Sequence, residues 1–402
     1  MKSNINKNKK EKKKRLRKPS FFIYYILGPL VILWIKTMVK IKMRNKLKIE
    51  GPSLIISPHR SYYDFLIVPM LIYPVRSHIV ATTYWYRNNF LKFLLNITGT
   101  IPKNQYRNDV RSIIRIADYL KLGRNVMMFP EGQMSTYGKP LILPSGLDKL
   151  IKKYKPNVYF INPQGTYLFS PKWNPTPGKG VVDASINLLI DKNDIDNLNL
   201  DTINKILNKA FDSNDDLSIM REHPEYKYMR KNKARGLEKV LMKCPDCGEI
   251  LPFETNKLNL TCKSCGLSLT FEKDSYRFKE NNPKYKDLKD LFDIDRTSFE
   301  NEIDNGLILE DEATFSYFES LKEEPLFSGK VIMDREKISF LCPEDESKNI
   351  CIYNNKVINY TITLGRDFEV PTPDKTYRVY PKDGYRSIFY WNYIAILKNK
   401  ER

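Results

Sequence analysis

The sequence predicts an α/β domain, then a small cysteine-rich segment, then a β-rich C-terminal part. Three observations carry this prediction. Between residues 20 and 190, short apolar runs typical of buried strands alternate with stretches of helical spacing. Two C-x2-C pairs follow in the middle of the chain. Most of the remainder consists of short alternating runs separated by Gly, Pro, Asn and Asp, which is typical of antiparallel strands.

The length and the charge narrow the class of protein. The chain has 402 residues, which is typical of two or three domains, and its 42% hydrophobic content excludes a wholly disordered protein. The formal net charge of +20 points to an anionic partner, either nucleic acid or a membrane surface. Much of this charge lies in residues 7–18, so we expect residues 1–19 to form a basic, disordered tail.

An apolar stretch, Phe21–Ile35, follows the tail and ends at Lys36. It is shorter than the roughly 20 residues that cross a bilayer comfortably, and Pro29 would kink a helix there. No small-residue cleavage site follows it, which argues against a signal peptide. We expect a short spanning, re-entrant or interfacial helix that places the protein on the cytoplasmic face of a membrane. The alternative is a buried core helix.

The α/β domain is expected over residues 20–240, with a polar, helical end. Short apolar runs predict buried strands at Leu54–Ser57, Asn125–Phe129 and Val158–Asn162. Helical spacing or apolar character marks the segments between them, which are Phe65–Tyr73, Phe90–Ile97 and Asp109–Leu122.

His59 and Asp64 are the first candidates for chemistry, because His59 directly follows a predicted strand. On an ideal helix, residues five positions apart lie about 140° apart, so the two meet only if His59 precedes the helix in a turn. Pro58 supports such a turn. A carboxylate bonded to one ring nitrogen raises the basicity of the other, which can then accept a proton from an alcohol. The alternative is a helix start with a satisfied histidine.

The segment Phe129–Ser135, which reads FPEGQMS, is the second candidate. Its chain leaves a predicted strand through Pro130, and Gly132 permits close approach of the backbone. Glu131 therefore lies at a strand end, where ligand sites of α/β proteins are common. The alternative is an ordinary turn after a strand.

Together these segments resemble the glycerolipid acyltransferase family that acylates lysophosphatidic acid. The resemblance covers roughly residues 20–190 and rests on an H-x4-D motif with an FPEG motif about seventy residues later. The segments that carry it are HRSYYD (59–64), GTIPKNQYR (99–107), NVMMFPEGQMS (125–135) and VYFINP (158–163).

The resemblance implies an α/β acyltransferase domain in which His59 acts as general base on the acceptor hydroxyl and Asp64 orients it. The residues expected to shape the acceptor site are Phe129, Pro130, Glu131, Gly132 and Ser135. The implied donor is acyl-CoA, acyl-carrier protein or an acyl phosphate. The implied acceptor is a lysophospholipid such as 1-acylglycerol-3-phosphate, so the predicted function is O-acyl transfer in membrane phospholipid synthesis or remodelling.

Two pairs of positions depart from the family's usual motifs. Residues 133–134 read Gln-Met where Thr-Arg often follows FPEG, and residues 104–105 read Asn-Gln where Asp-Arg is usual. Phosphate binding needs cations more than one particular residue, so we expect Lys103 and Arg107 to supply the missing charge. The alternative is an acceptor that is not a simple phosphate monoester.

The cysteine segment, expected over residues 241–275, predicts a zinc ribbon. Two C-x2-C pairs are separated by fourteen residues, and a glycine follows each pair; the cysteines are Cys244, Cys247, Cys262 and Cys265. Four thiolates satisfy tetrahedral zinc without an open position, which makes the metal structural. The alternative is a set of disulfides or a redox pair. Cys342 and Cys351 are expected to be ordinary thiols.

The C-terminal part, residues 276–402, combines β runs with a final apolar helix at residues 388–397. That order resembles pleckstrin-homology or GRAM-like domains, which often bind lipids or proteins. The segment Gly132–Lys139 differs from a phosphate-binding loop in spacing, and we expect no nucleotide or redox cofactor. The chain has no G-x-S-x-G motif, which leaves a serine hydrolase unsupported.

Two rival functions remain at the level of the sequence. One is a catalytically inactive membrane scaffold or lipid-binding protein on an acyltransferase fold. The other is a nucleic-acid-binding protein that uses the basic tail and the zinc ribbon. Nucleic acid is the less favoured partner, because it leaves the apolar helix unexplained and because the ribbon carries Glu249, Glu254 and Glu272.

Overall fold

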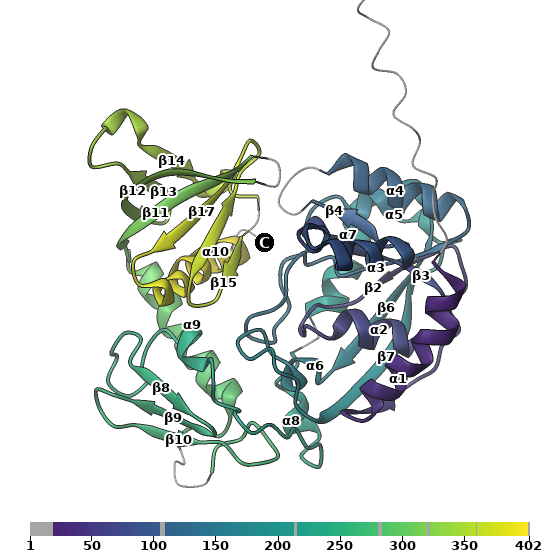
Figure 1. Ribbon diagram of the computed structural model, residues 1–402, viewed down its shortest axis with the longest axis horizontal. Helices are drawn as coiled ribbons and strands as arrows, with labels where there is room; N and C mark the ends of the chain where they lie inside the picture. The colour runs from purple at the N-terminus through teal and green to yellow at the C-terminus, as the bar shows by residue number, and fades with distance from the viewer. Residues whose placement is uncertain are drawn as a thin grey trace, which may run out of the picture.

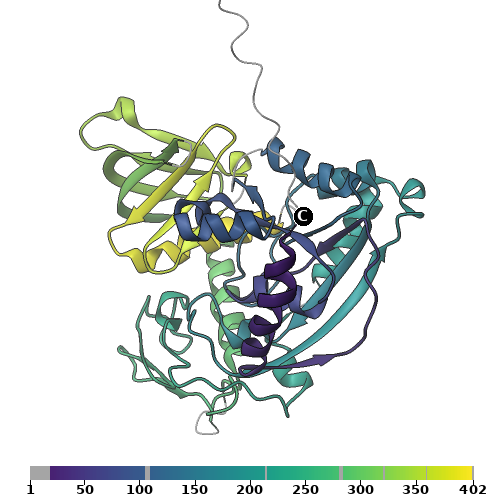
Figure 2. The same ribbon diagram turned by 45° about the vertical axis from the view of Figure 1, so that its right-hand side comes forward.

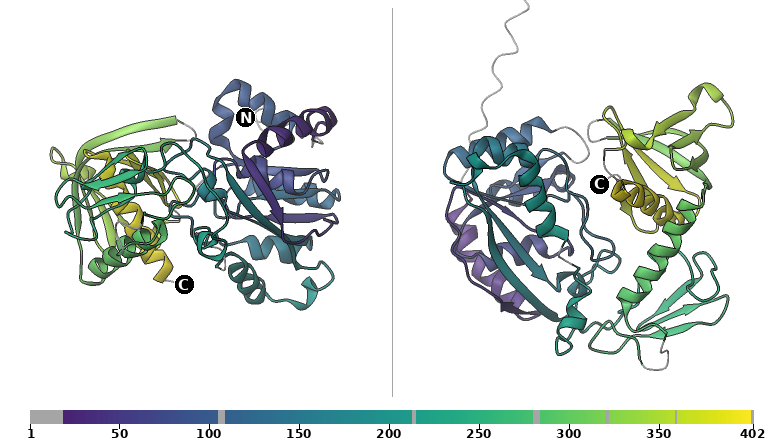
Figure 3. Two further views of the ribbon diagram at one scale, coloured as in Figure 1. Left: turned by 90° about the horizontal axis from the view of Figure 1, so that it is seen from below. Right: turned by 180° about the vertical axis from the view of Figure 1, so that it is seen from behind.

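The computed structural model describes residues 19–104, 109–212, 215–279, 284–319, 322–358 and 360–400. The expected basic tail lies outside the described residues, except for Pro19. Figure 1 shows an α/β half beside a second half that contains a small sheet and a larger C-terminal sheet. Seen from behind in Figure 3, helix α9 (Leu288–Asp304) runs from the small sheet to the larger one.

The α/β half is built on a seven-stranded sheet with the order β1-β7-β6-β2-β5-β3-β4. Strands β6, β2, β5, β3 and β4 run parallel, whereas β7 runs antiparallel to β6 and pairs in parallel with β1. The predicted buried strands correspond to β2, β5 and β6, so these predictions are confirmed. The bounds are β1 (Val39–Met43), β2 (Ser53–Ile56), β3 (Ser77–Thr82), β4 (Ile101–Lys103), β5 (Asn125–Met128), β6 (Asn157–Gln164) and β7 (Gly180–Ile190).

Helices cover both faces of this sheet. Successive side chains of a strand point to opposite faces, so one strand packs against helices on each side. Leu54 and Ile56 of β2 pack in one core cluster with α4 (Val110–Lys121), α5 (Leu147–Tyr154) and α7 (Leu200–Asp212). Ile55 packs on the other face with Val68 and Ile72, at the end of α2 (Asp64–Leu71). A strand buried on both faces explains the unbroken apolar run in the sequence.

Helix α1 (Gly28–Lys36) continues a short π-helical turn and lies on the same face as α2. Only Ile35 of α1 is buried, so the alternative of a core helix is wrong. The large apolar side chains that stay exposed before and along it are Phe21, Phe22, Ile26, Leu27, Leu30, Val31, Leu33 and Trp34. Among the described residues, no helix is both long enough and apolar enough to cross a membrane.

A second apolar helix, α3 (Asn89–Ile97), meets the start of this segment. The Ser20 N–H donates to the Ile97 carbonyl at 3.1 Å, and Figure 2 shows α1 and α3 on the same side of the molecule. Phe90 and Phe93 of α3 are exposed by more than half. Both helices therefore expose large apolar side chains.

The second half begins with a three-stranded antiparallel sheet of β8 (Phe253–Asn256), β9 (Asn259–Cys262) and β10 (Ser268–Thr270). Two short helices, α6 (Thr166–Phe169) and α8 (Ile219–Glu222), lie earlier in the chain. The predicted ribbon segment thus contains a compact three-stranded sheet.

The C-terminal sheet has seven antiparallel strands in the order β14-β13-β12-β11-β17-β16-β15. β11 was not expected, because it lies in an acid-rich stretch; its exposed charges alternate with buried Ala313 and Phe315. The predicted last helix is confirmed as α10 (Ser387–Lys400). The bounds of the strands are β11 (Leu309–Glu319), β12 (Lys322–Met333), β13 (Lys337–Leu341), β14 (Ile350–Tyr353), β15 (Thr361–Thr363), β16 (Asp367–Pro371) and β17 (Thr376–Pro381).

One apolar core joins the two halves. It includes Tyr137, Tyr167 and Trp173 from the α/β half and extends through the small sheet and α9 to Ile396 of α10. The C-terminal half therefore packs against the segment that follows β5.

Candidate active site

The parallel strands bring the candidate residues to one edge of the sheet. Because β2 and β5 are neighbours and run parallel, their carboxyl ends meet at the same edge. His59 lies three residues beyond β2, and Phe129 directly follows β5. The two rings stack, with centroids 4.8 Å apart.

His59 and Asp64 lie in hydrogen-bond contact, with 3.0 Å between Nδ1 and Oδ2. His59 lies in the turn before α2, and Asp64 is the first residue of that helix, which is the arrangement the spacing required. Asp64 Oδ2 also accepts the backbone N–H groups of Arg60 at 2.6 Å and Ser61 at 2.7 Å. These donors fix the buried carboxylate at the helix N-terminus, where the helix dipole favours a negative charge.

This arrangement can activate a hydroxyl group. A carboxylate at Nδ1 favours the tautomer that carries its proton there, which leaves Nε2 as the basic nitrogen. The His59 side chain keeps 28% of its surface exposed, whereas Asp64 is fully buried. The histidine is therefore accessible to a substrate, and the aspartate is not.

The FPEG turn is tight and tied to His59. Gly132 has a φ of 73°, and its N–H donates to the Phe129 carbonyl at 3.3 Å. The Ser135 N–H donates to the His59 carbonyl at 2.8 Å. The Ser135 hydroxyl donates to the Lys139 carbonyl at 2.6 Å, so the structure places this predicted substrate-binding residue as a support of the loop.

Glu131 is 2% exposed, and neither carboxylate oxygen makes a hydrogen bond of good geometry within the described chain. Burial raises the pKa of Glu131 to about 8, although the Arg60 guanidinium and the nearby N–H groups of His59 and Leu141 oppose the shift. The pKa favours the neutral acid at pH 7, so this predicted acceptor-site residue is an uncharged group beside the histidine.

Sequence reasoning missed a buried ion pair beside Glu131. Arg60 Nη1 lies 2.6 Å from Asp216 Oδ1, and both residues are at most 1% exposed. Asp216 Oδ2 accepts the Tyr167 N–H at 2.8 Å. Arg60 could have been found as the arginine inside the HRSYYD motif. Asp216 gave no signal, because it lies 156 residues away in a polar stretch.

Lys103 lies at the same sheet edge but away from His59. It ends β4, and strands β5 and β3 lie between β4 and β2, which separates the two strands by about 14 Å at ordinary strand spacing. Burial lowers the pKa of Lys103, and Asp109 opposes the shift. Arg107, the second predicted cation, lies outside the described residues.

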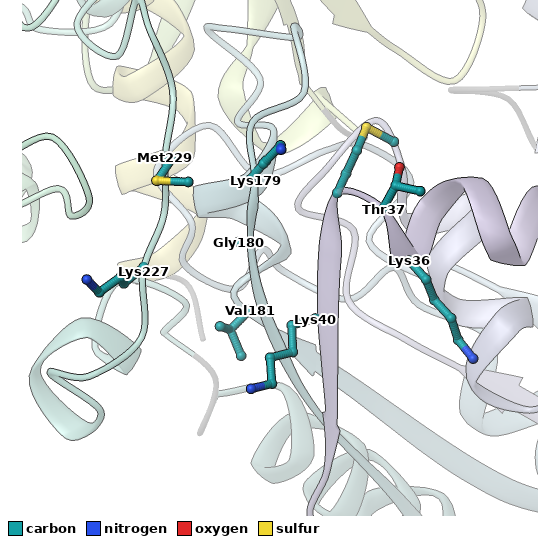
Figure 4. A pocket seen from close by; sticks show the side chains of 9 residues that line it. Lys36, Thr37, Lys40, Lys179, Gly180, Val181, Lys227 and Met229 are labelled. Atoms are coloured by element: carbon teal, nitrogen blue, oxygen red, sulfur yellow. The ribbon is translucent and has the colours of Figure 1, made fainter.

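A shallow hollow of about 270 Å³ lies at the other side of this edge, where β1 and β7 begin. Figure 4 shows that the side chains of Lys36, Lys40, Lys179 and Lys227 surround it and spread outward. Lys227 pairs with Asp274 at 3.2 Å, and the other three make no ion pair within the described part of the chain. The hollow marks a cationic surface at the end of α1.

The four cysteines of the small sheet lie with all their sulfurs within 4.8 Å of one another. Two sulfur pairs are 3.7 and 3.8 Å apart, close to the edge of about 3.8 Å that a tetrahedron with Zn–S bonds of 2.3 Å requires. A disulfide would bring two sulfurs to about 2.05 Å, and none of these cysteines is so joined. The donor set therefore fits a structural zinc ion. The four members are Cys244, Cys247, Cys262 and Cys265.

Comparison with known proteins agrees with this fold. Residues 38–161 match the family model described as Acyltransferase, a range that includes His59, Asp64 and the FPEG turn. This match supports the resemblance to the acyltransferase family that was drawn from the motifs.

Among solved structures, the chain is similar to the 1-acyl-sn-glycerophosphate (LPA) acyltransferase PlsC from Thermotoga maritima. The TM-score is 0.40 at 18% identity, and the match covers 46% of this chain and 74% of that one. A likeness at this level says nothing about the substrate. None of the curated proteins matches the chain.

Proposed function

We propose that this acyltransferase moves a fatty acyl group from an acyl thioester or acyl phosphate to the hydroxyl of a lysophospholipid such as 1-acylglycerol-3-phosphate. The observation that carries the proposal is the 3.0 Å contact between His59 and Asp64, at an edge shared with the FPEG turn. In the supporting geometry, the His59 side chain is 28% exposed and its Nδ1 faces the buried carboxylate of Asp64.

In the proposed reaction, His59 Nε2 accepts the proton of the lysolipid hydroxyl as its oxygen attacks the acyl carbonyl. The bond between the carbonyl carbon and the leaving group then breaks, and the departing thiolate or phosphate takes the proton back from His59. The Asp64 carboxylate stabilises the imidazolium that forms between the two steps. No covalent acyl-enzyme is needed.

The acceptor proposal takes account of the altered motif. Gln133 and Met134 are at most 7% exposed, and neither is a cation. The positions that often carry Thr-Arg therefore provide no exposed cation here. Lys103, at the carboxyl end of β4, is the predicted headgroup cation that lies within the described residues. We propose that Lys103 binds the acceptor headgroup, and the same role is proposed for Arg107 from the sequence alone.

The working surface is proposed to lie on the cytoplasmic face of a membrane. The exposed apolar side chains of α1 and α3 suit an interfacial position. The ring centroids of Trp34 and Tyr63 are 6.3 Å apart, and Tyr63 directly precedes Asp64 in the chain. The lysines around the hollow at the end of α1 would add attraction to anionic lipid. Membrane lipids are therefore the proposed partners, and zinc is the proposed structural ion.

The test is a panel of labelled acyl-CoA, acyl-carrier protein and acyl phosphate donors against lysolipids with different headgroups, using purified, zinc-loaded protein in detergent. Transfer to a lysolipid hydroxyl, greatest for a phosphate headgroup, is the expected result. Transfer only to acceptors without a phosphate would refute the acceptor proposal. No transfer across the panel would favour the rival function of an inactive lipid-binding scaffold.

A further inference from the structure

We infer that the C-terminal half positions the catalytic histidine, with Tyr137 and Asn392 as the positioning residues. The inference rests on the proposed function and assigns a role to the part of the chain beyond the acyltransferase match. It starts from the loop of residues 135–139, which follows the FPEG turn.

The 135–139 loop is bonded to His59 at one end and closed upon itself. The Ser135 N–H donates to the His59 carbonyl at 2.8 Å, and the Ser135 hydroxyl donates to the Lys139 carbonyl at 2.6 Å. The carbonyl of Thr136 accepts the Tyr167 hydroxyl at 2.7 Å. A shift of this loop would therefore move the backbone of His59.

The side chain of Tyr137 extends from the loop into the core of the C-terminal half. Its side chain is 2% exposed, and its hydroxyl accepts Asn392 Nδ2 at 2.7 Å and donates to the Val240 carbonyl at 3.3 Å. The ring packs edge-on against Phe292 of α9, with 5.0 Å between centroids. Three distant parts of the chain thus hold one side chain of the loop.

Asn392 is a polar side chain in an otherwise apolar place. It lies in α10 within the fully buried run Ile388–Ile396, and its own exposure is 0%. Its Oδ1 has no hydrogen-bond partner in the described chain, which makes the residue costly for the core. Its Nδ2 donates within α10 to the Ile388 carbonyl at 3.0 Å and outside α10 to the Tyr137 hydroxyl, so the bond to Tyr137 ties α10 to the loop.

A second contact joins the same loop to the same half. Lys139 forms an ion pair with Asp293 of α9, and Asp293 also pairs with Lys289 at 2.9 Å. Because a displacement of about 1 Å at a catalytic group can reduce the rate by about 10²-fold, such supports affect turnover without touching substrate. The contacts thus link α9 and α10 to the geometry of His59.

The experiment uses full-length Asn392→Leu and Tyr137→Phe, which keep the branched or aromatic shape of the side chain but remove the hydrogen bond. We expect kcat to fall about 10- to 100-fold, with the KM of each substrate changed less than about twofold, because the loop positions His59 and does not bind substrate. The effect of the double variant on kcat should be smaller than the product of the two single effects, because both single variants remove the bond between these two side chains.

The matched control is Asn354→Leu. Asn354 is also a buried asparagine of the C-terminal half with an unpartnered Oδ1, but its amide donates to the carbonyls of Asp334 and Arg335. Its substitution should lower stability and leave kcat unchanged. Equal loss of kcat in the control, or full kcat in Asn392→Leu, would overturn the inference.

Amide exchange of the peptide that covers residues 131–139 gives a readout that needs no activity. Exchange should be faster in Asn392→Leu than in wild type or Asn354→Leu. Unchanged exchange would overturn the positioning role even if the wild type transferred no acyl group, so failure of this inference and failure of the proposed function are distinguishable.

Discussion

His59 and Glu131 follow neighbouring strands, yet burial gives them different roles. The His59 side chain is partly exposed, whereas Glu131 is buried beside the Arg60–Asp216 ion pair. Desolvation outweighs the attraction of Arg60 and raises the pKa of Glu131 to about 8. The raised pKa favours the protonated, uncharged form of Glu131 near neutral pH, so its role in the site is to fill space and not to supply a charge.

This pKa has a consequence for stability. The ordinary pKa of this carboxyl group is 4.5, and in the folded protein it is about 8. Between these two pH values, folded Glu131 keeps a proton that the unfolded chain releases. Its contribution to the stability is therefore full below pH 4.5 and is lost as the pH rises toward 8. Glu131→Gln should remove the dependence, and the stability of the wild type relative to the variant should fall by a few kcal/mol from pH 5 to 8. Urea unfolding of both proteins at each pH measures it. If the unfolding free energies of the wild type and the variant changed with pH in the same way, the raised pKa of Glu131 would be contradicted.

At this scale the sequence predicts contacts within one motif better than contacts between distant segments. The spacing of His59 and Asp64, together with Pro58, predicts their meeting in a turn, and the structure places them so. The partner of Arg60 could not be predicted, because Asp216 reaches it only after the polar segment folds back. The hydroxyl of Ser135 is likewise bonded within its own loop.

At the scale of elements, hydrophobic runs predict the strands that are buried on both faces. The runs at β2, β5 and β6 stand out because helices cover both sides of them. β11 was missed because it lies in an acid-rich stretch, although its apolar residues alternate with its charges as in a strand. The likeness of the C-terminal sheet and α10 to pleckstrin-homology or GRAM domains stays a prediction.

The cysteine segment makes a prediction about metal. The purified protein should contain one zinc ion per chain, and Cys247→Ser with Cys265→Ser should abolish binding and lower the thermal midpoint, because structural zinc contributes directly to folding. Metal analysis and thermal unfolding measure both effects. Cys342→Ser with Cys351→Ser is the control, and equal metal loss there would exclude this site.

At the scale of the whole molecule, the apolar surface of α1 and α3 and the lysine-rimmed hollow lie on one α/β half, and the C-terminal half supports the loop behind His59. The order of these parts could be predicted from the sequence, but their packing could not. The shared core depends on residues such as Tyr137 and Trp391, which lie far apart in the chain.

The apolar surface predicts how the protein binds vesicles. Leu30→Glu with Leu33→Glu should weaken binding to anionic vesicles at least 10-fold, because each buried leucine contributes about 1.5–3 kcal/mol. Binding of the wild type should also fall as salt rises. Vesicle sedimentation measures both.

The control replaces two exposed isoleucines of the C-terminal half, Ile308→Glu with Ile358→Glu, and should bind vesicles like the wild type. An equal loss in both variants would mean that added negative charge, and not the surface of α1, explains the effect.

The measurement that tests the central claim most directly is the acyl-transfer rate of the full chain with His59 or Asp64 replaced. His59→Ala should lower kcat by about 10²- to 10⁴-fold, as expected for loss of a general base, and Asp64→Asn should lower it strongly because the tautomer of His59 is no longer fixed. His223→Ala, at an exposed histidine elsewhere, should leave kcat unchanged. Transfer at the wild-type rate by folded His59→Ala would contradict the account.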